Sequence, residues 1–301
     1  MPDAPTLKSL LFIEKRPGGL YRMKKLIPVV LILAIFLSTP IYAQTTLFVG
    51  LAPGHFQYKE KEHDTTLDKD YGFLIGLNAT VLYAKDPYST AHSRQAWWMR
   101  GNLNFAFTHR ATYKGQTQSG DPLKFDDEHE TVYMFEGDLG YTFEARVPWG
   151  IINVTPYTGV GYRRWSRGQT DTNTGNYKEV YTWGFVPLGV NMFPQAKPES
   201  WLIGLDLAVL LPFSPRLEAH LHDLNPVFED VDFELPSRPG FRIQVPLLFK
   251  SSSKWSVRFV PMYTYWSFDQ SGFEETAGLP VYEPASATHR FQVLLSVGYT
   301  W

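Results

Sequence analysis

The chain has 301 residues, no cysteine and a formal net charge of −2. The absence of cysteine excludes disulfides, thiolate metal sites and cysteine nucleophiles, and the near-neutral charge gives no electrostatic footprint for nucleic acid. Aromatic residues make up 16% of the chain, including 17 tyrosines and 9 tryptophans, whose half-apolar rings suit a boundary between lipid and water.

A short apolar stretch near the N-terminus has the composition of a secretory signal peptide. Residues 23–25 read Met-Lys-Lys, and an unbroken apolar run follows over 26–37. That run is shorter than the ~20 residues that a membrane-spanning helix needs. We therefore expect a signal peptide over 23–43, cleaved after Ala43, in preference to a membrane anchor.

The chain on either side of this segment divides accordingly. Residues 1–22 lie in front of a complete signal peptide and have no basic-then-apolar pattern of their own. We predict that they are a mis-assigned N-terminal extension and that translation begins at Met23. Residues 44–301 then form the exported part, a length that suits one β domain.

Ten segments of the exported part alternate apolar and polar residues with the period of two that belongs to a β-strand. In one of them Phe73, Ile75 and Leu77 share a face. Because polar residues alternate with the apolar ones, the mean hydropathy stays at −0.21 although nearly every strand has an apolar face. The predicted strands are 45–58, 71–84, 96–109, 130–144, 151–166, 178–193, 201–212, 239–250, 255–268 and 289–301.

The last strand has the most specific pattern. It places Phe291, Val293, Leu295, Val297, Tyr299 and Trp301 on one face, and an aromatic residue is the last of the chain. This resembles the closing strand of bacterial outer-membrane β-barrels, in which the terminal aromatic is an assembly signal. The resemblance assigns that role to Trp301, with Tyr299 before it.

The resemblance implies an all-β fold: a transmembrane, antiparallel, up-and-down β-barrel of about ten strands, within a range of roughly eight to twelve. It also implies the general OmpA/OmpX-like or porin-like type and a place in the outer membrane of a Gram-negative cell. Alternation also fits a soluble β-sandwich or a lipocalin-like barrel. Apolar faces on nearly every strand favour the membrane barrel. Aromatic residues near strand ends, at the expected membrane boundary, favour it too: Trp97, Tyr133, Trp149, Trp165, Trp201, Trp255 and Trp301.

The connections between the predicted strands alternate in length, as outside loops and periplasmic turns do in such barrels. Because the strand number is even, both ends of the barrel domain are expected on the periplasmic side. The shorter connections are 85–95, 145–150, 194–200 and 251–254, and the long, polar ones are 59–70, 110–129, 167–177, 213–238 and 269–288.

Positions predicted to face the lumen carry charges of both signs. A barrel of about ten strands has little more room than one of eight, which side chains fill, and buried charges are tolerated when they are paired. We therefore predict a lumen plugged by an ionic and amide network, and a narrow porin for small solutes stays open as the alternative. The charged residues are Arg100, Glu136, Asp138, Arg163, Asp206, Arg242 and Arg258.

Two long loops offer candidate catalytic residues: Asp126 and Asp127 in the second, and His220, His222 and Asp223 in the fourth. They resemble, in residue type, the acidic pair and the Asp–His pair at the extracellular rim of the omptins, which are outer-membrane proteases. The acidic residues here are adjacent, so one strand would not present both to one substrate. Solvated surface loops are the alternative interpretation.

Other kinds of site have less support in the sequence. A lipid-modifying enzyme would use a Ser–His pair, and the adjacent pair is His92 and Ser93 in a predicted periplasmic turn. No chelating motif appears, so no metal or cofactor is expected. The expected partners are outer-membrane lipid and lipopolysaccharide, the barrel-assembly machinery and an extracellular ligand or host surface, without nucleic acid.

Overall fold

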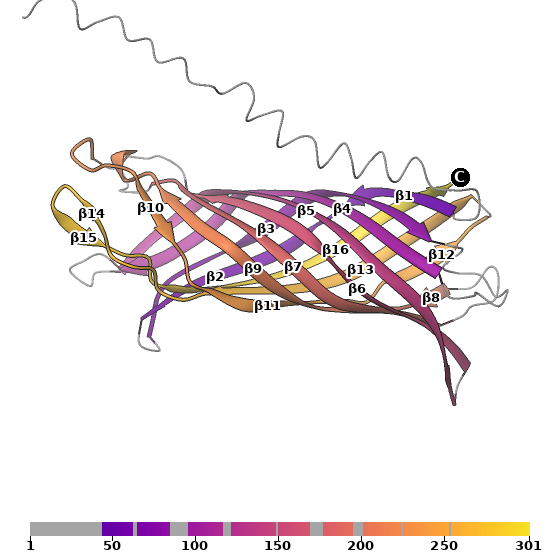
Figure 1. Cartoon of the computed structure of the whole chain (residues 1–301). Coiled ribbons are helices and arrows are strands. Elements are labelled where there is room, and N and C mark those ends of the chain that lie inside the picture. Colours follow the sequence, from indigo (N-terminus) through magenta and orange to yellow (C-terminus); the bar gives the residue numbers. More distant parts are fainter. Residues whose placement is uncertain are drawn as a thin grey trace, which may run out of the picture. The chain divides into compact units, whose positions relative to one another are not determined.

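A closed ring of antiparallel β-strands forms the structure (Figure 1). The computed structural model describes residues 44–62, 65–84, 96–116, 122–148, 150–168, 177–194, 201–223, 225–252 and 254–301. The predicted N-terminal extension and signal peptide, and the predicted turn at 85–95 with His92 and Ser93, lie outside these residues. Within them, no helix is long and apolar enough to cross a membrane.

Seven strands of the ring are continuous, and three are each split into two segments. The continuous strands are β3 (Thr65–Ala84), β4 (Ala96–Gln116), β5 (Pro122–Val147), β6 (Gly150–Arg167), β7 (Glu179–Pro194), β13 (Trp255–Phe268) and β16 (Ala285–Thr300). The split strands are β1 (Gln44–Leu51) with β2 (Gly54–Glu62), β8 (Trp201–Ile203) with β9 (Leu205–Ala219), and β11 (Ser237–Gln244) with β12 (Leu247–Lys250). The predicted ten-stranded barrel is thereby confirmed.

The ring closes between its first and last strands. Leu47 pairs with Tyr299 across β1 and β16, and Gly54 pairs with Gln292 across β2 and β16. The start of β1 and the last residues of β16 therefore lie at the same end of the barrel, which we call the terminal end. The opposite end, the loop end, carries the short elements η1 (Leu221–Asp223), β10 (Val231–Glu234), β14 (Glu274–Thr276) and β15 (Leu279–Val281) (Figure 1).

Proline accounts for two of the three strand interruptions. Pro53 stands between β1 and β2, and Pro246 stands between β11 and β12. Proline has no amide hydrogen, so it cannot donate to the ladder and breaks it locally. The neighbouring amides still find partners: Ala52 donates to Gly76 O at 2.7 Å and Gly204 donates to Pro246 O at 2.8 Å.

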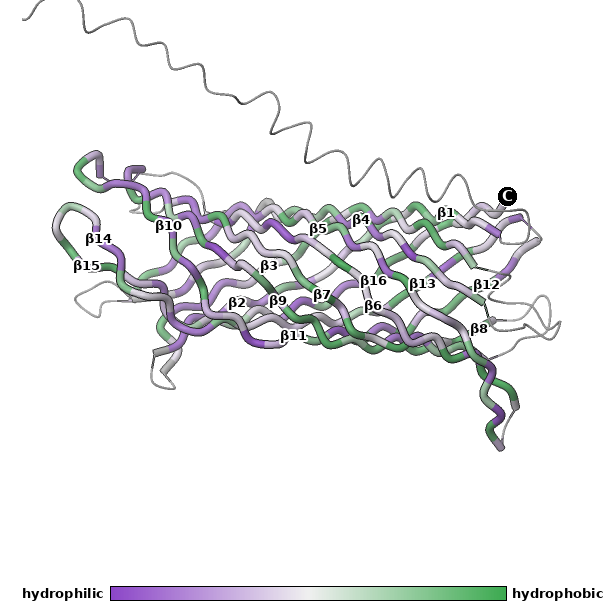
Figure 2. The backbone as a smooth tube through the Cα atoms, in the orientation of Figure 1, coloured by the Kyte–Doolittle hydropathy of each residue, from purple (hydrophilic) through white to green (hydrophobic). Residues whose placement is uncertain are grey.

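The two faces of the barrel wall follow the predicted alternation. Leu77, Leu103 and Trp201 are each 58–60% exposed on the outer face, whereas Arg242 and Asp206 are buried inside. Apolar and polar residues alternate along the wall (Figure 2). The lumen is therefore the core of this protein, and the outer face is the surface that lipid would cover.

Several strands are longer than a bilayer requires. β3, β4 and β5 have 20, 21 and 26 residues, whereas a tilted strand crosses the hydrocarbon with about 9–11. The prediction of long loops at 59–70 and 110–129 is wrong, because most of these residues continue the strands. The outward-facing side chains of these strand extensions are polar. The apolar, lipid-facing pattern therefore ends where the extensions begin, although the hydrogen bonding between strands continues.

One aromatic residue also differs from the prediction. Trp165 belongs to the set expected near strand ends at the membrane boundary, with Trp97, Tyr133, Trp149, Trp201, Trp255 and Trp301. Its side chain is 2% exposed and faces the lumen, where the indole Nε1 donates to Glu130 Oε2. Along β6 it shares the inward side with Arg163 and Arg167, so the strand's own period explains its position.

Candidate functional site

In the middle of the lumen lies an ionic network centred on Arg100. Its Nε donates to Asp138 Oδ2 at 2.8 Å, and its Nη1 donates to Asp206 Oδ2. Asp206 also accepts hydrogen bonds from the Tyr157 hydroxyl at 2.6 Å and from Asn191 Nδ2 at 3.1 Å. These side chains come from β4, β5, β6, β7 and β9, so the network joins half of the barrel wall across its interior.

A second guanidinium completes this network from the other side. Both terminal nitrogens of Arg242, on β11, donate hydrogen bonds to the carboxylate of Glu136, and the distance from Nη2 to Oε1 is 2.7 Å. Both side chains are almost fully buried, at 2% and 0% exposed. Arg100 Nη2 lies 3.6 Å from Glu136 Oε1, so the two arginines share this carboxylate. Paired in this way, the charges avoid the cost of an isolated buried ion.

The structure thus brings five of the seven predicted lumen charges into one network, and it places the other two elsewhere. Arg163 lies over the ring of Trp183, with 5.0 Å from Cζ to the ring centroid. Arg258 donates to Thr80 Oγ1 at 2.9 Å and lies over the ring of Phe48. Each of these two guanidinium groups lies over an aromatic ring, whose face attracts a cation.

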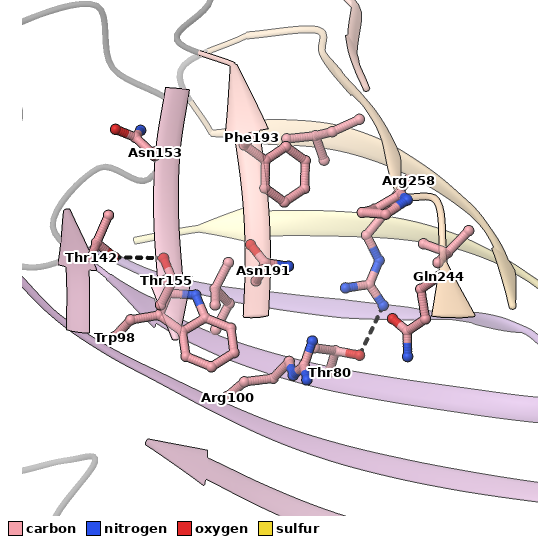
Figure 3. A pocket seen from close by; sticks show the side chains of 14 residues that line it. Thr80, Trp98, Arg100, Thr142, Asn153, Thr155, Asn191, Phe193, Gln244 and Arg258 are labelled. Atoms are coloured by element: carbon pink, nitrogen blue, oxygen red, sulfur yellow. Dashed lines mark hydrogen bonds between the residues drawn. The ribbon is translucent and has the colours of Figure 1, made fainter. Parts of the chain in front are cut away.

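A small cavity lies on the terminal side of the network (Figure 3). Its volume is about 50 Å³, and Trp98, Arg100, Asn191 and Arg258 are among the side chains that line it. Figure 3 shows Arg258 pointing toward Thr80. A second cavity beside the network has about 20 Å³. Spaces of this size hold at most a few water molecules.

A second buried ionic cluster lies in the lumen toward the loop end. Arg167 donates from Nε to Glu179 and from Nη2 to Glu60, at 2.9 Å for the latter. Its guanidinium lies 4.0 Å from the centroid of the Tyr58 ring. The Tyr58 hydroxyl donates to Glu60 Oε1 at 2.9 Å. This cluster lies beyond the lipid-facing belt, because the outward residues of β2 and β3 at this level include Lys59 and Lys69.

Above this cluster a polar pocket of about 150 Å³ opens at the loop end. Tyr113, Phe125, Tyr177 and Tyr282 contribute rings to its wall. Among the described residues of the lining, Arg167 is the one basic residue, against six acidic residues: Glu60, Asp68, Asp70, Glu128, Glu179 and Glu283. We call this space the mouth pocket.

Carboxyl groups in and below the mouth pocket are protonated more readily than usual. Burial raises the pKa of Glu283, and the charges of Glu60 and Glu179 raise it further. Burial also raises the pKa of Asp70 and of Glu130, and the charge of Asp70 adds to the rise at Glu130. Desolvation disfavours the charged form, and a neighbouring carboxylate acts in the same direction.

Sequence reasoning missed the acidic residues of this end, although a signal for them exists. Arg167 and Arg163 are an even number of residues apart on one strand, so they share a face of that strand. The same holds for Glu60 and the inward-facing Tyr58. The prediction that strands end near 58 and 166 removed both from the lumen. Extending the period of two beyond the lipid-facing belt would have placed them inside.

The predicted catalytic residues are not assembled into a site among the described residues. Asp126 is exposed on β5, where Lys124 donates to it at 2.6 Å. His220 Nδ1 lies 3.3 Å from Asp230 Oδ2, and His222 Nδ1 lies 3.2 Å from Phe228 O. Asp223 ends the short helix η1. No contact joins Asp126 to these loop residues within the described ranges, and the side chain of Asp127 lies outside them.

The predicted assembly signal lies on the outer surface of the terminal end. Trp301 is 62% exposed, and its amide donates to Thr45 O at 3.1 Å. The ring of Tyr299 packs edge-to-face on Trp255 with 5.0 Å between centroids. Both aromatic residues are therefore accessible for recognition from outside the barrel.

Comparisons with known proteins bear on the fold. No protein-family model matches the sequence, and no curated protein is similar to it in sequence. Among solved structures, the outer-membrane protease OmpT of Escherichia coli is similar with a TM-score of 0.55, over 87% of this chain and 98% of OmpT at 9% identity. The translocator domain of the autotransporter NalP of Neisseria meningitidis matches 93% of this chain and 96% of its own, with a TM-score of 0.38 and 9% identity.

At such identities a structural likeness carries information about the fold and not about the activity. The protease activity of OmpT is therefore not transferred to this chain. The closed ring, the apolar outer face, the polar core and the structural likeness to OmpT agree with one another. The chain has the fold of a bacterial outer-membrane β-barrel.

Proposed function

We propose that this protein is an integral outer-membrane barrel whose lumen is sealed by side chains and whose loop end faces out of the cell to engage a ligand. The observation that supports the proposal is that two buried ionic groups occupy the lumen. The network of Arg100 and Arg242 lies in its middle, and the cluster around Arg167 lies toward the loop end. The cavities between the walls hold at most a few waters.

The outer face supports the location in a bilayer. Exposed apolar residues such as Phe73, Leu103 and Leu295 form a belt around the barrel, and outer-membrane lipid and lipopolysaccharide are the natural partners of such a belt. Export through a cleaved signal peptide and recognition of Trp301 by the barrel-assembly machinery belong to the same proposal. N-terminal sequencing of the protein extracted from outer membranes tests the cleavage after Ala43.

Conductance tests the sealed lumen directly. The protein is purified from outer membranes in detergent and inserted into a planar bilayer, and its fold is checked by the heat-dependent shift of its band in gel electrophoresis. We expect a folded barrel that passes no steady current, because the ion pairs that occupy the lumen among the described residues would interrupt a water path between its two ends. Reproducible single-channel openings from the folded protein would refute the sealed lumen and identify a narrow porin.

A further inference from the structure

We propose that a row of lysines on the outer wall of the barrel binds the phosphate groups of lipopolysaccharide in the surrounding membrane. The row, which we call the lysine row, consists of Lys59, Lys69, Lys114 and Lys124. The inference deepens the proposed function and rests on it in one respect: the loop end must face out of the cell, where this lipid lies. It does not depend on whether the lumen conducts.

The strand register places the four lysines directly opposite one another on four neighbouring strands. Lys59 of β2 pairs with Lys69 of β3. Lys69 also pairs with Lys114 of β4, which in turn pairs with Lys124 of β5. Residues directly opposite each other on antiparallel strands have Cβ atoms about 4.5–5.5 Å apart. The four side chains therefore start from one continuous line across the wall.

The lysine side chains lie on the outer surface of the wall. Lys114 and Lys124 are exposed, and Lys59 and Lys69 are half-buried. The ammonium groups of Lys69 and Lys114 lie 5.2 and 5.5 Å from the centroid of the same ring, that of Tyr71. Two cations thus gather at one aromatic ring, which attracts each of them but does not cancel their charge.

Such a row costs stability unless an anion neutralises it, because like charges directly opposite on neighbouring strands repel. Among the described side chains that point outward from β2–β5 on the loop side of the apolar belt, Asp126 is the one carboxylate. Lys124 donates to it at 2.6 Å, and Lys114 is its second electrostatic neighbour. One carboxylate against four ammonium groups leaves a surface that attracts anions.

The place of the row beside the apolar belt favours a lipid headgroup as the source of these anions. Lys69 lies four residues beyond the exposed Phe73 along β3. Lys124 lies nine residues beyond the exposed Tyr133 along β5. The row therefore begins close to the apolar belt and runs obliquely away from it, as the tilt of barrel strands by about 35–45° requires.

This oblique course matches a headgroup with phosphates at several depths. Lipopolysaccharide has that form, because it carries phosphates on its lipid anchor and on its inner sugars. A phospholipid with a single phosphate would meet only the end of the row near the belt. Lysine binds phosphate as a point charge with three donors on a flexible stem, so the row does not require one fixed geometry of its ligand.

Isothermal titration calorimetry of the detergent-solubilised protein tests the inference. The probe is purified lipopolysaccharide in the same detergent, and its control is the same lipopolysaccharide after treatment with alkaline phosphatase. We expect saturable binding that dephosphorylation weakens by about tenfold or more, since it removes charge-assisted hydrogen bonds. Added salt should weaken the binding of the phosphorylated form, because the lysines are at the surface and are screened.

Two double variants separate the lysine row from the overall charge of the protein. Lys69→Gln with Lys114→Gln removes the two central charges of the row and should weaken binding about tenfold or more. Lys250→Gln with Lys254→Gln is the matched control. It removes the same charge at the terminal end, where β12 ends and β13 is about to begin, and it should leave binding unchanged.

The direct pairing of the lysines gives a second readout, which a row of merely solvated lysines would not produce. In vesicles of phosphatidylcholine alone, Lys69→Gln with Lys114→Gln should unfold at a urea concentration no lower than the unchanged protein, because repulsion is relieved. Lipopolysaccharide added to the vesicles should raise the urea midpoint of the unchanged protein more than that of the variant, since a ligand of the folded state stabilises it.

Each other result overturns a stated part of the inference. Equal binding by the unchanged protein and the variant of Lys69 and Lys114, or equal rises in their urea midpoints, refutes the lysine row as the site. Equal binding of dephosphorylated lipopolysaccharide refutes recognition of phosphate. An equal rise with phosphatidylglycerol in the vesicles refutes lipopolysaccharide as the lipid. Tighter binding of heparin than of lipopolysaccharide assigns the row to a soluble polyanion instead.

These outcomes are separable from a failure of the proposed function. The detergent-solubilised protein exposes both of its ends, so the binding measured there does not depend on which end faces out of the cell. A barrel that conducts and still binds lipopolysaccharide through the row refutes only the sealed lumen. A silent barrel whose binding ignores the row refutes only this inference.

Discussion

The pair of Arg242 and Glu136 makes the sealed lumen quantitatively testable. Both side chains are almost completely excluded from solvent, and two parallel N–H···O bonds join them. Arg242→Met removes the cation and leaves Glu136 with Arg100 at 3.6 Å as its remaining cationic neighbour. Removal of one partner from a buried pair costs about 3–5 kcal/mol, because a charge is left uncompensated in a low-dielectric interior.

The double variant tests the cause of this loss. Arg242→Met with Glu136→Leu removes both charges, and Arg100 keeps Asp138 and Asp206 as partners. Replacing a whole buried pair by apolar groups is often close to neutral. We therefore expect the double variant to be more stable than Arg242→Met alone, with a coupling of about 2 kcal/mol or more between the two sites.

Urea unfolding in lipid vesicles, followed by tryptophan fluorescence, measures these free energies. Arg216→Met is the matched control, because Arg216 is 64% exposed and lies 3.7 Å from Glu234, which is 87% exposed; such a surface pair is worth at most about 1 kcal/mol. Added salt should change the Arg242 result little, since buried charges are poorly screened. If Arg242→Met costs no more stability than Arg216→Met, the buried pair does not stabilise the barrel interior as this reasoning requires.

Three further predictions follow from local geometry. Gly161→Ala should destabilise the barrel by about 1–3 kcal/mol in the same urea assay, because the new Cβ atom would lie 2.1 Å from the ring of Phe185. Gly137→Ala is the control: its Cβ atom would meet no atom within 4 Å, so it should cost less stability. The raised pKa of Glu283 means that folding favours the protonated form of this carboxyl group. Its contribution to stability is therefore present at acidic pH and is lost as the pH rises through the raised pKa. Glu283→Gln should make urea midpoints measured between about pH 5 and pH 9 less dependent on pH, and an unchanged slope would contradict this assignment. Trp301 is exposed and its amide makes a backbone hydrogen bond, so its deletion should lower the free energy of unfolding in vitro by about 1 kcal/mol. The same deletion should reduce the amount of assembled barrel in the outer membrane of cells. A large loss of stability in vitro would show a structural role instead.

Much of the barrel wall could be predicted because apolar, outward-facing residues and polar, lumen-facing residues alternate along each strand. Phe241 and Ile243 face outward and Arg242 faces inward, as the period of two requires. The same period failed as a guide to strand ends, since the apolar face stops at the membrane boundary while hydrogen bonding continues. Glu60 and Arg167 were therefore assigned to loops although they point into the lumen.

The sequence by itself determined the strand order, the lipid-facing side of each strand and the presence of charges of both signs inside, because all of these are properties of single strands and their neighbours. Only the tertiary structure decided which charges meet. Arg100 reaches Asp206 across the lumen, 106 residues away along the chain, and Arg163 meets Trp183 where a carboxylate was expected. Such partners are fixed by the tilt and closure of the whole barrel, which no local pattern encodes.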